Sequence, residues 1–492
     1  MKQRHSSRIS FPSPGTPGEG KGGGLGAISS SPNTKPPPQS SPRVPGEEVR
    51  GAYSGIQISC LTLIVVLATA IRIPGLFTDF WFDEIWSWTI AGKLHSIADI
   101  LFAEPARIDN NHPLNTLWLF LLGPSAPIWL YRMPSLLAGV GSVIVAMRIM
   151  SRRGFVAAVS AGVLIGFGFP FIFYSSEARG YSLAVLFGLL AFDQLEQNTP
   201  RTDWLFGTFS ALGLLSHFTF LHVLTGAFVY VVIRRTPAAR LVRLFTLPIV
   251  TAGFLARVFV RFMTIGGALP TDPKHIITWS LSLVFNGPDH GMTCVLAAAL
   301  ALLAFLTALR FDRVCVFFFV AVIASPLLTT TRELLADHPQ PLMVRYYLIC
   351  LAFLSLALCP LIQRIWERSR FDRAGVVVCA VLFLAGALIH ETRFLSLGRG
   401  QVVAMLRHID ESGSTDICSD SIERTKTYVA FYEPRLHESF RLDSEPAEWL
   451  IFNRESMYAD RSTAFHGVQY DLDSVYPTCS LSGWPLWLYH RR

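Results

Sequence analysis

The chain has 492 residues, of which 51% are hydrophobic and only 16% are charged, against roughly 25% charged residues in soluble domains. The charges lie between long apolar stretches, so a soluble protein of this composition would need many fully buried helices in one oversized core. The net charge of +7 does not indicate nucleic-acid binding, because most Lys and Arg lie in the N-terminal arm and in short loops and not on one contiguous face. These features predict a polytopic membrane protein.

Residues 1–52 are rich in Pro, Gly and Ser. Such a segment cannot bury enough apolar surface to offset the entropy of ordering, which predicts a disordered cytoplasmic arm. A removable signal peptide would need its apolar core much nearer Met1. The first apolar segment is therefore expected to be a retained helix.

Four apolar segments approach the roughly 20 residues of a spanning helix, and assigning the basic loops to one side gives about eleven transmembrane helices in all. Their approximate ranges are 56–73, 128–147, 155–174, 181–195, 204–217, 219–233, 244–262, 291–309, 314–331, 346–363 and 374–390. The loops between them alternate between basic and acidic, and basic loops belong on the cytoplasmic side. The alternation is consistent only if residues 112–123, which are too short to span, form an interfacial or re-entrant part of a large first outside loop.

Residues 53–390 are therefore expected to form an all-α membrane bundle, and residues 391–492 a small extracytoplasmic α/β domain. In the second region Val402–Ile409 has a helical pattern, and Thr427–Phe431 and Trp449–Phe452 are strand-like. Cys418 and Cys479 lie here and can pair if the region is extracytoplasmic. The other six of the eight cysteines lie in apolar segments, and none has zinc-ligand spacing.

The first outside loop carries two adjacent acids among aromatic residues, Asp83 and Glu84 within residues 80–86. Interfacial aromatics are ordinary membrane anchors, and adjacent acids are usually solvated. An apolar setting, however, raises the proton affinity of a carboxylate and suits it to general base catalysis. The same loop ends in a second polar cluster that includes His112.

A very short outside turn, residues 174–181, holds Glu177 and Arg179. A surface ion pair within the turn is the alternative explanation and would contribute little stability, but ionisable residues at membrane depth are costly and often functional. His217 and Arg345 lie on the same side and, taken singly, are more often helix-end anchors. Together, these groups fit a reaction that needs a base and a phosphate-binding site.

These motifs resemble the multi-spanning glycosyltransferases that use polyprenyl-phosphate-linked sugars, the C-type glycosyltransferase fold, which include protein mannosyltransferases and the aminoarabinose transferase of lipid A. The resemblance runs through most of residues 56–390. The matching elements, in the family's order, are Asp83-Glu84, Asn111-His112-Pro113-Leu114, Tyr131-Arg132-Met133-Pro134-Ser135, Tyr174–Tyr181, Ser216-His217-Phe218 and Arg345-Tyr346. The family's second Pro and Tyr are absent after Pro113, and Ser176 replaces a Gln.

The resemblance implies an inverting transfer of a sugar from a polyprenyl-phosphate donor to an acceptor on the outer face. Asp83 would be the base, with Glu84 and Glu177 positioning substrate or holding a divalent cation. Arg345, with Arg179, would neutralise the departing phosphate. Further substrate-binding candidates are His112, His217, Tyr181 and Tyr346.

The resemblance also implies a multi-pass protein of the cell (inner) membrane, with a lipid, glycan or protein acceptor. No cofactor is certain, although a divalent metal is compatible with the three acids. The alternative function is a transporter or flippase of lipid-linked saccharides. Transporters tend to contain internal repeats and polar groups near the bilayer midplane, whereas the acids here gather at one interface and no repeat is visible.

Overall fold

The structure is a computed structural model that describes residues 53–108, 112–260, 272–308, 327, 330–331, 342–442, 445–453, 459–479, 481 and 483–492. Residues 53–492 form one compact unit. The predicted arm of residues 1–52, the end of the first loop at 109–111 and most of the predicted helix 314–331 lie outside the described residues.

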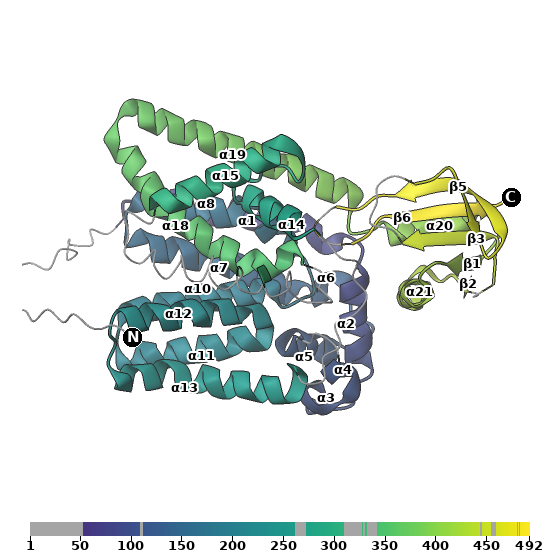
Figure 1. The fold of residues 1–492 in the computed structure, drawn as a ribbon, viewed down its shortest axis with the longest axis horizontal. Helices are drawn as coiled ribbons and strands as arrows, with labels where there is room; N and C mark the ends of the chain where they lie inside the picture. Colours follow the sequence, from purple (N-terminus) through teal and green to yellow (C-terminus); the bar gives the residue numbers. More distant parts are fainter. Residues whose placement is uncertain are drawn as a thin grey trace, which may run out of the picture. The chain divides into compact units, whose positions relative to one another are not determined.

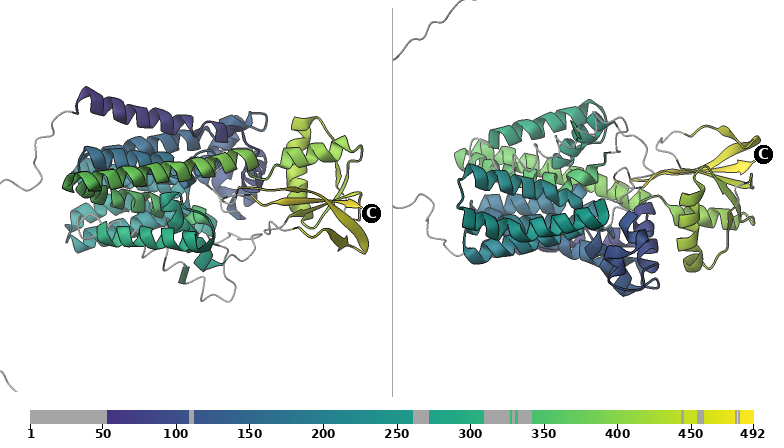
Figure 2. Two further views of the ribbon diagram at one scale, coloured as in Figure 1. Left: turned by 90° about the horizontal axis from the view of Figure 1, so that it is seen from above. Right: turned by 60° about the horizontal axis from the view of Figure 1, so that its bottom comes forward.

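Helices dominate the described chain up to residue 397, and the long ones run side by side (Figures 1 and 2). Their bounds are α1 (Gly55–Ala70), η1 (Pro74–Phe77), α2 (Phe82–Gly92), α3 (Asp99–Phe102), α4 (Glu104–Ile108), α5 (Pro113–Leu122), α6 (Ile128–Tyr131), α7 (Met133–Ser151), α8 (Phe155–Phe167), α9 (Phe169–Tyr174), α10 (Tyr181–Gln197), α11 (Pro200–Ser216), η2 (Phe218–Phe220), α12 (Leu221–Ile233), α13 (Ala238–Leu255), η3 (Ala256–Val260), α14 (Pro273–Ser282), η4 (Leu283–Phe285), α15 (Gly291–Ala308), η6 (Val344–Tyr347), α18 (Leu348–Arg368) and α19 (Arg370–Leu397).

Six helical segments of the described chain are long and apolar enough to cross a membrane, so the protein is a multi-pass membrane protein. They are Gly55–Phe77, Met133–Ser151, Ala238–Phe259, Gly291–Ala308, Val344–Arg368 and Arg370–Glu411. Their outward faces carry large apolar side chains, including Leu303, Leu382 and Ile389, which are each more than 60% exposed. Such exposure is costly in water but matches a lipid environment.

Two predicted helices are interrupted. The predicted helix 155–174 breaks at Gly168 into α8 and α9, because Pro170 has no N–H to continue the backbone ladder. The predicted helix 128–147 begins as the single turn α6 and restarts at Met133, where Pro134 occupies the first turn of α7. Proline is favoured in that position because the first N–H groups of a helix have no internal partner.

The loop between η1 and α6, called the acidic loop below, is largely helical and contains α2, α3, α4 and α5. The helix α5 has 10 residues, too few to cross a hydrocarbon core of about 30 Å. It packs against α2 and α11. The loop therefore forms a folded layer, and the acidic motif lies in the first turn of α2.

Basic residues at the other ends of the helices pair with acids that the loop-charge argument did not consider. Arg152 contacts Glu196 at 2.9 Å and also pairs with Asp193. Arg240 and Arg243 both contact Asp203, at 2.8 and 3.0 Å. The positive-inside rule counts Lys and Arg and not net charge, so these pairs do not alter the predicted orientation.

The C-terminal segment contains a mixed six-stranded sheet with the strand order β2-β1-β3-β6-β5-β4. The strands are β1 (Asp416–Ser419), β2 (Arg441–Leu442), β3 (Trp449–Asn453), β4 (Ser462–Phe465), β5 (Val468–Tyr476) and β6 (Leu486–Arg491). β1 is parallel to β2 and β3, and the remaining pairs are antiparallel. The helices α20 (Val402–Glu411) and α21 (Ile422–Leu436) complete it.

One face of this sheet shares a hydrophobic core with the acidic loop. Trp449 and Ile451 of β3 lie in a cluster with α20, α21 and Phe80, whereas Leu450 and Phe452 face a separate cluster on the other side. This alternation follows the two-residue period of a strand. The C-terminal α/β region therefore shares a hydrophobic core with the acidic loop.

The C-terminal prediction was right in class but wrong in one element. Val402–Ile409 is helical and Trp449–Phe452 lies in a strand, as predicted, but Thr427–Phe431 lies inside the helix α21. Its buried Thr425, Tyr428, Val429 and Tyr432 recur at helical spacing. The β-branched and aromatic residues had suggested a strand, and burial on one helical face explains them better.

The cysteines Cys418 and Cys479 are free and buried, so the pairing considered from the sequence is wrong. Cys418 lies on β1, where its thiol contacts the carbonyl of Trp449. Cys479 packs into the core of the helical bundle, and its N–H donates to the carbonyl of Gly398. The two thiols belong to different hydrophobic clusters and do not meet.

Candidate active site

The acids Asp83 and Glu84 occupy the first turn of α2. Negative charge is favoured there by the helix dipole. Neighbouring residues on a helix point in different directions, so the two carboxylates have different environments. The sequence predicted a pair of acids, and the helix separates them into two sites.

Asp83 faces two arginines. Its Oδ2 lies 3.1 Å from Arg345 Nη2 and 4.0 Å from Arg179 Nη2. The Asp83 side chain is 21% exposed, and that of Arg345 is 10% exposed. Asp83 is therefore paired with cations and still reachable by a substrate.

Glu84 is fully buried, and both of its carboxylate oxygens accept hydrogen bonds. Arg132 donates to both of its oxygens, from Nε at 2.8 Å and from Nη2 at 2.7 Å, and the N–H of Ala178 donates at 2.7 Å. This bidentate geometry is the strong form of a carboxylate–guanidinium pair. Because Ala178 belongs to the turn that carries Glu177, Glu84 joins that turn to α2. This placement favours a positioning role over the predicted catalytic one.

Glu177 is also buried, and the indole N–H of Trp81 donates to its Oε1 at 3.0 Å. Burial, followed by the nearby Glu84 charge, raises the pKa of Glu177 to about 7. A carboxyl in a low-dielectric environment binds its proton more tightly. Glu177 lies deeper in the protein than Asp83 and next to the same loop.

Arg345 and Tyr346 lie in η6, directly before α18. The Arg345 guanidinium carbon lies 5.1 Å from the Trp81 ring centre and 5.6 Å from that of Tyr346. Arg179 reaches the same loop, where its Nη1 donates to Ser87 Oγ at 2.6 Å and to the Asp83 carbonyl at 3.2 Å. Segments that are far apart in the sequence thus bring two cations to one acid.

Three further predicted residues, His112, Tyr181 and His217, form an aromatic cluster. The ring centres lie 4.7 Å apart for the two histidines and 4.6 Å apart for Tyr181 and His217. Tyr346 faces His217 at 6.4 Å. All of the predicted site residues that the structure describes therefore gather around the acidic loop.

The close approach in this cluster requires a glycine at position 180. A Cβ atom on Gly180 would lie 1.9 Å from the carbonyl oxygen of Ser216 and 3.2 Å from His112 Nδ1. These contacts are far inside van der Waals distance, and the first is with backbone that cannot move aside cheaply. Gly180 was part of the predicted motif, and its role is to let three segments touch.

The carboxylates of the site are not arranged to bind the divalent metal ion that the resemblance allowed. Among the residues that the structure describes, no three His, Cys, Asp or Glu side chains form a group that could hold a metal ion. Asp83 faces guanidinium groups, and the oxygens of Glu84 are taken by Arg132 and Ala178. Carboxylates with these partners are poorly placed to bind a cation.

The C-terminal segment contacts the residues that lead into the acidic motif. The sequence did not predict these contacts. Arg399 Nη1 donates to Thr78 Oγ1 at 2.6 Å, and the N–H of Val403 donates to Asp79 Oδ2 at 3.1 Å. Arg399 is 1% exposed. The only sequence signal is an arginine between two glycines just after the last apolar helix.

The helix α21 adds a third contact. Tyr432 Oη donates to the Phe80 carbonyl at 2.9 Å, and Phe431 stacks on the Phe80 ring at 5.3 Å. Residues 78, 79 and 80 are thus each held by the region after α19, within five residues of Asp83. The C-terminal region is part of the frame of the site.

Replacing Tyr432 with Phe should lower the rate of turnover roughly two- to tenfold, because a buried hydrogen bond contributes about 0.5–1.5 kcal/mol and here it fixes the approach to Asp83. The ring packing would remain. Tyr489→Phe is the matched control, since Tyr489 of β6 donates to the carbonyl of Asp460, just before β4, at 3.0 Å. Equal effects of the two changes on turnover, measured at equal amounts of folded protein, would contradict a positioning role.

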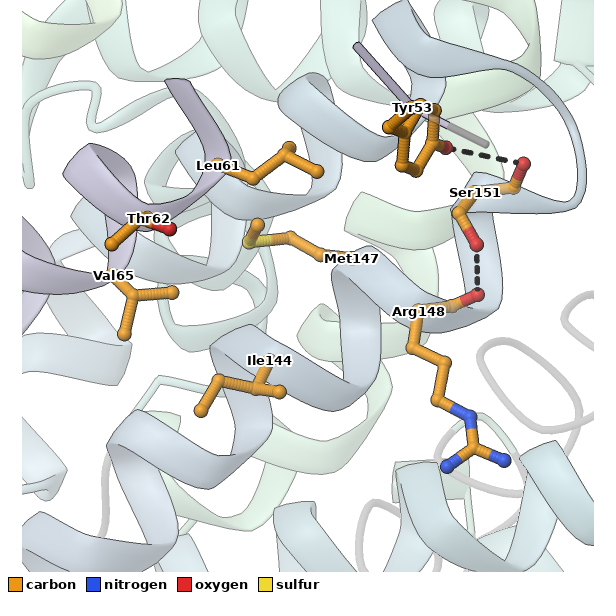
Figure 3. A pocket seen from close by; sticks show the side chains of 8 residues that line it. All are labelled: Tyr53, Leu61, Thr62, Val65, Ile144, Met147, Arg148 and Ser151. Carbon is orange, nitrogen blue, oxygen red and sulfur yellow. Dashed lines mark hydrogen bonds between the residues drawn. The ribbon is translucent and has the colours of Figure 1, made fainter. Parts of the chain in front are cut away.

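Two cavities of the described chain are lined by residues outside this cluster. One, of about 320 Å³, is lined by α1 and α7 residues and by Tyr53, whose hydroxyl donates to the carbonyl of Ser151 (Figure 3). The other, of about 530 Å³, lies against α20 and includes His408 and Tyr476. Neither is lined by a predicted site residue.

No family model and no curated protein matches the sequence. Among solved structures, the chain is similar to ArnT from Cupriavidus metallidurans in the apo state, with a TM-score of 0.51 and 12% identity over 81% of this chain and 93% of ArnT. ArnT bound to undecaprenyl phosphate matches with a TM-score of 0.47, 12% identity, and 89% and 98% coverage. The arabinofuranosyltransferase AftD from Mycobacteria matches with a TM-score of 0.44, 14% identity, and 75% and 30% coverage. The likeness to apo ArnT confirms the predicted C-type glycosyltransferase fold.

Proposed function

We propose that this protein transfers a sugar from a polyprenyl-phosphate donor to a hydroxyl or amine acceptor, on the outer face of the cell membrane. The observation that carries the proposal is the contact between Asp83 and Arg345 at 3.1 Å in a partly exposed position. A base and an anion-binding group in contact are what such a transfer requires. The shared fold with ArnT supports the class of reaction.

In this proposal Arg345 and Arg179 bind the phosphate of the donor. Asp83 forms ion pairs with these two arginines in the resting protein, and the incoming phosphate would replace it. Arginine suits this role because its planar fork binds phosphate oxygens in a bidentate way. Release of Asp83 by the phosphate would couple donor binding to the appearance of a free base.

Asp83 then accepts the proton of the acceptor as the acceptor oxygen or nitrogen bonds to the anomeric carbon. The bond between that carbon and the phosphate oxygen breaks, and polyprenyl phosphate leaves with its charge neutralised by Arg345. A single in-line displacement inverts the anomeric configuration. Asp83 is preferred over Glu84 and Glu177 because it is 21% exposed, whereas both glutamates are buried.

The orientation proposed from the loop charges places the N-terminus in the cytoplasm and the C-terminal region outside. The hydroxyl of Tyr53, just before α1, reaches Ser151 at the end of α7. This places the beginning of α1 beside the basic residues at the end of α7, as expected if both are cytoplasmic. The acidic loop and the C-terminal region share one core, which supports placing both on the same side of the membrane.

A strain that lacks the gene is expected to lose one sugar from an envelope glycan, lipid or protein and to accumulate the lipid-linked form of that sugar. Mass spectrometry of both fractions measures this. Re-expression of the native chain should restore the product, and re-expression of Asp83→Asn should not. If the protein were a transporter of lipid-linked saccharides and Asp83 took part in no chemical step, re-expression of Asp83→Asn would restore the product. That result would contradict the proposal.

A further inference from the structure

The rings of His112 and His217 stack with an angle of 22° between their planes. In each ring Nδ1 is hydrogen-bonded. Nε2 of each ring is buried and has no hydrogen-bond partner among the described residues. The hydroxyl of Tyr181, beside them, is also buried and has no hydrogen-bond partner among the described residues. Buried polar atoms are normally paired, and an unpaired one costs about 1–3 kcal/mol. Three such atoms beside Arg345 indicate a place for a polar ligand group.

The proton position on His112 follows from its partner. Its Nδ1 lies 2.9 Å from the carbonyl oxygen of Ser216. A carbonyl only accepts hydrogen bonds, so Nδ1 carries the proton. Burial and the nearby Arg179 hold the pKa of His112 well below its usual range, so the ring is neutral. Its Nε2 therefore presents a lone pair and accepts a hydrogen bond.

His217 has the opposite arrangement. The backbone N–H of Thr219 donates to His217 Nδ1 at 3.1 Å, and the Thr219 hydroxyl lies 2.7 Å from the same atom. A backbone N–H only donates, so His217 Nδ1 carries no proton. The ring must then be neutral, with its proton on Nε2. His217 Nε2 is therefore a hydrogen-bond donor.

We propose that His112 and His217 together bind one hydroxyl group of the sugar that is transferred, His112 accepting its proton and His217 donating to its oxygen. A hydroxyl is the group that both donates and accepts. A phosphate dianion offers only acceptors and would leave His112 unpaired, and an ammonium group offers only donors and would leave His217 unpaired. The proposal rests on the proposed function and adds a neutral hydroxyl as the recognised group.

The position of the pair assigns this hydroxyl to the donor sugar. Tyr346 directly follows Arg345 and faces His217 at 6.4 Å, whereas Asp83 contacts Arg345 itself. A sugar whose phosphate is bound by Arg345 would extend toward Tyr346 and the histidines. The acceptor would approach from the exposed side of Asp83.

The first test measures the protons directly. Solid-state NMR of the full-length protein in lipid bilayers, with ¹⁵N-labelled histidine, is expected to show His112 protonated at Nδ1 and His217 protonated at Nε2. The signals are assigned by their loss in His112→Phe and His217→Phe. The same tautomer at both positions, or an imidazolium at either, would overturn the proposal without any need for turnover.

The second test uses undecaprenyl-phosphate hexoses and pentoses, each supplied in its parent form and in mono-deoxy forms. The wild type should transfer one deoxy form about ten- to a hundredfold less efficiently than its parent, because two site groups lose their partner. His217→Phe keeps a stacking ring but removes one of the two partners, so it should prefer that parent over its deoxy form by only about three- to tenfold, the part that His112 still supplies. His390→Phe is the control, since His390 stacks on Phe169 away from the site.

The outcomes separate this proposal from the function on which it rests. Unchanged discrimination by His217→Phe would overturn the hydroxyl assignment and leave the transferase activity standing. A loss of discrimination that follows deoxy acceptors and not deoxy donors would refute the assignment to the donor sugar. Failure of the wild type to transfer any sugar of the panel would instead refute the proposed function.

Discussion

Asp83→Asn should reduce kcat by roughly 10²–10⁴-fold, the usual contribution of a general base, while the protein still inserts and keeps its thermal stability. Asn has the same shape and retains an oxygen that can accept from Arg345, but it cannot take up a proton. Arg345 is 10% exposed and can donate to the Asn oxygen, and Arg179 keeps its contacts with Ser87 and with the backbone carbonyl of residue 83. The loss should therefore appear in turnover and not in folding. Radiolabelled sugar transfer by purified protein measures it.

Asp99→Asn is the matched control in the same loop. Asp99 accepts from the N–H groups of His95 and Ser96 at 2.8 Å and is partly exposed, and Asn can keep those contacts. Near-normal transfer is expected from this variant. If Asp83→Asn transferred sugar as well as Asp99→Asn, Asp83 could not be the base, and the proposed mechanism would fail.

The helical bundle was predictable because its signal is local. Long apolar runs need no knowledge of the rest of the chain, and ranges such as 181–195 and 291–309 coincide with α10 and α15. The breaks at Gly168 and before Met133 have a local cause as well, in Pro170 and Pro134. A finer treatment of proline would have found them.

That the candidate residues lie close together was predictable, but the partner of each side chain was not. The motifs identified Asp83, Glu84 and Glu177 as a group because adjacent acids and a short turn are visible in a sequence. Which acid meets which arginine depends on the direction of each side chain in the first turn of α2. Arg132 saturates Glu84, and this pairing spans 48 positions of the chain, a distance at which sequence patterns give no orientation.

The frame supplied by the C-terminal region could not have been predicted at all. Arg399 and Thr78 are separated by 321 positions, and Tyr432 and Phe80 by 352. Composition suggested an independent domain after residue 390, because the region is soluble in character. The shared core with α2 shows that soluble composition and separate packing are different properties.

Arg345→Ala should weaken the apparent binding of the donor about ten- to a hundredfold and affect acceptor binding much less. A hydrogen bond to a charged group contributes about 1.5–3 kcal/mol, and Arg345 is the cation closest to Asp83, at 3.1 Å. In the wild type, Asp83 competes with the donor phosphate for this cation. Removing Arg345 leaves Asp83 partly exposed and therefore solvated, so the protein should still fold.

Arg345→Lys sharpens this test because it keeps the charge and removes the planar fork. A phosphate-binding role predicts an intermediate loss of donor affinity, since Lys binds phosphate as a point charge. Arg148→Ala is the control: its side chain is 63% exposed and pairs with Asp193 at 3.4 Å, away from the site. Equal losses of donor and acceptor affinity in Arg345→Ala would mean that Arg345 acts by holding Asp83 in place. The phosphate would then need another cation, and Arg179, 4.0 Å from the same carboxylate, is the group whose replacement should carry the donor-specific loss.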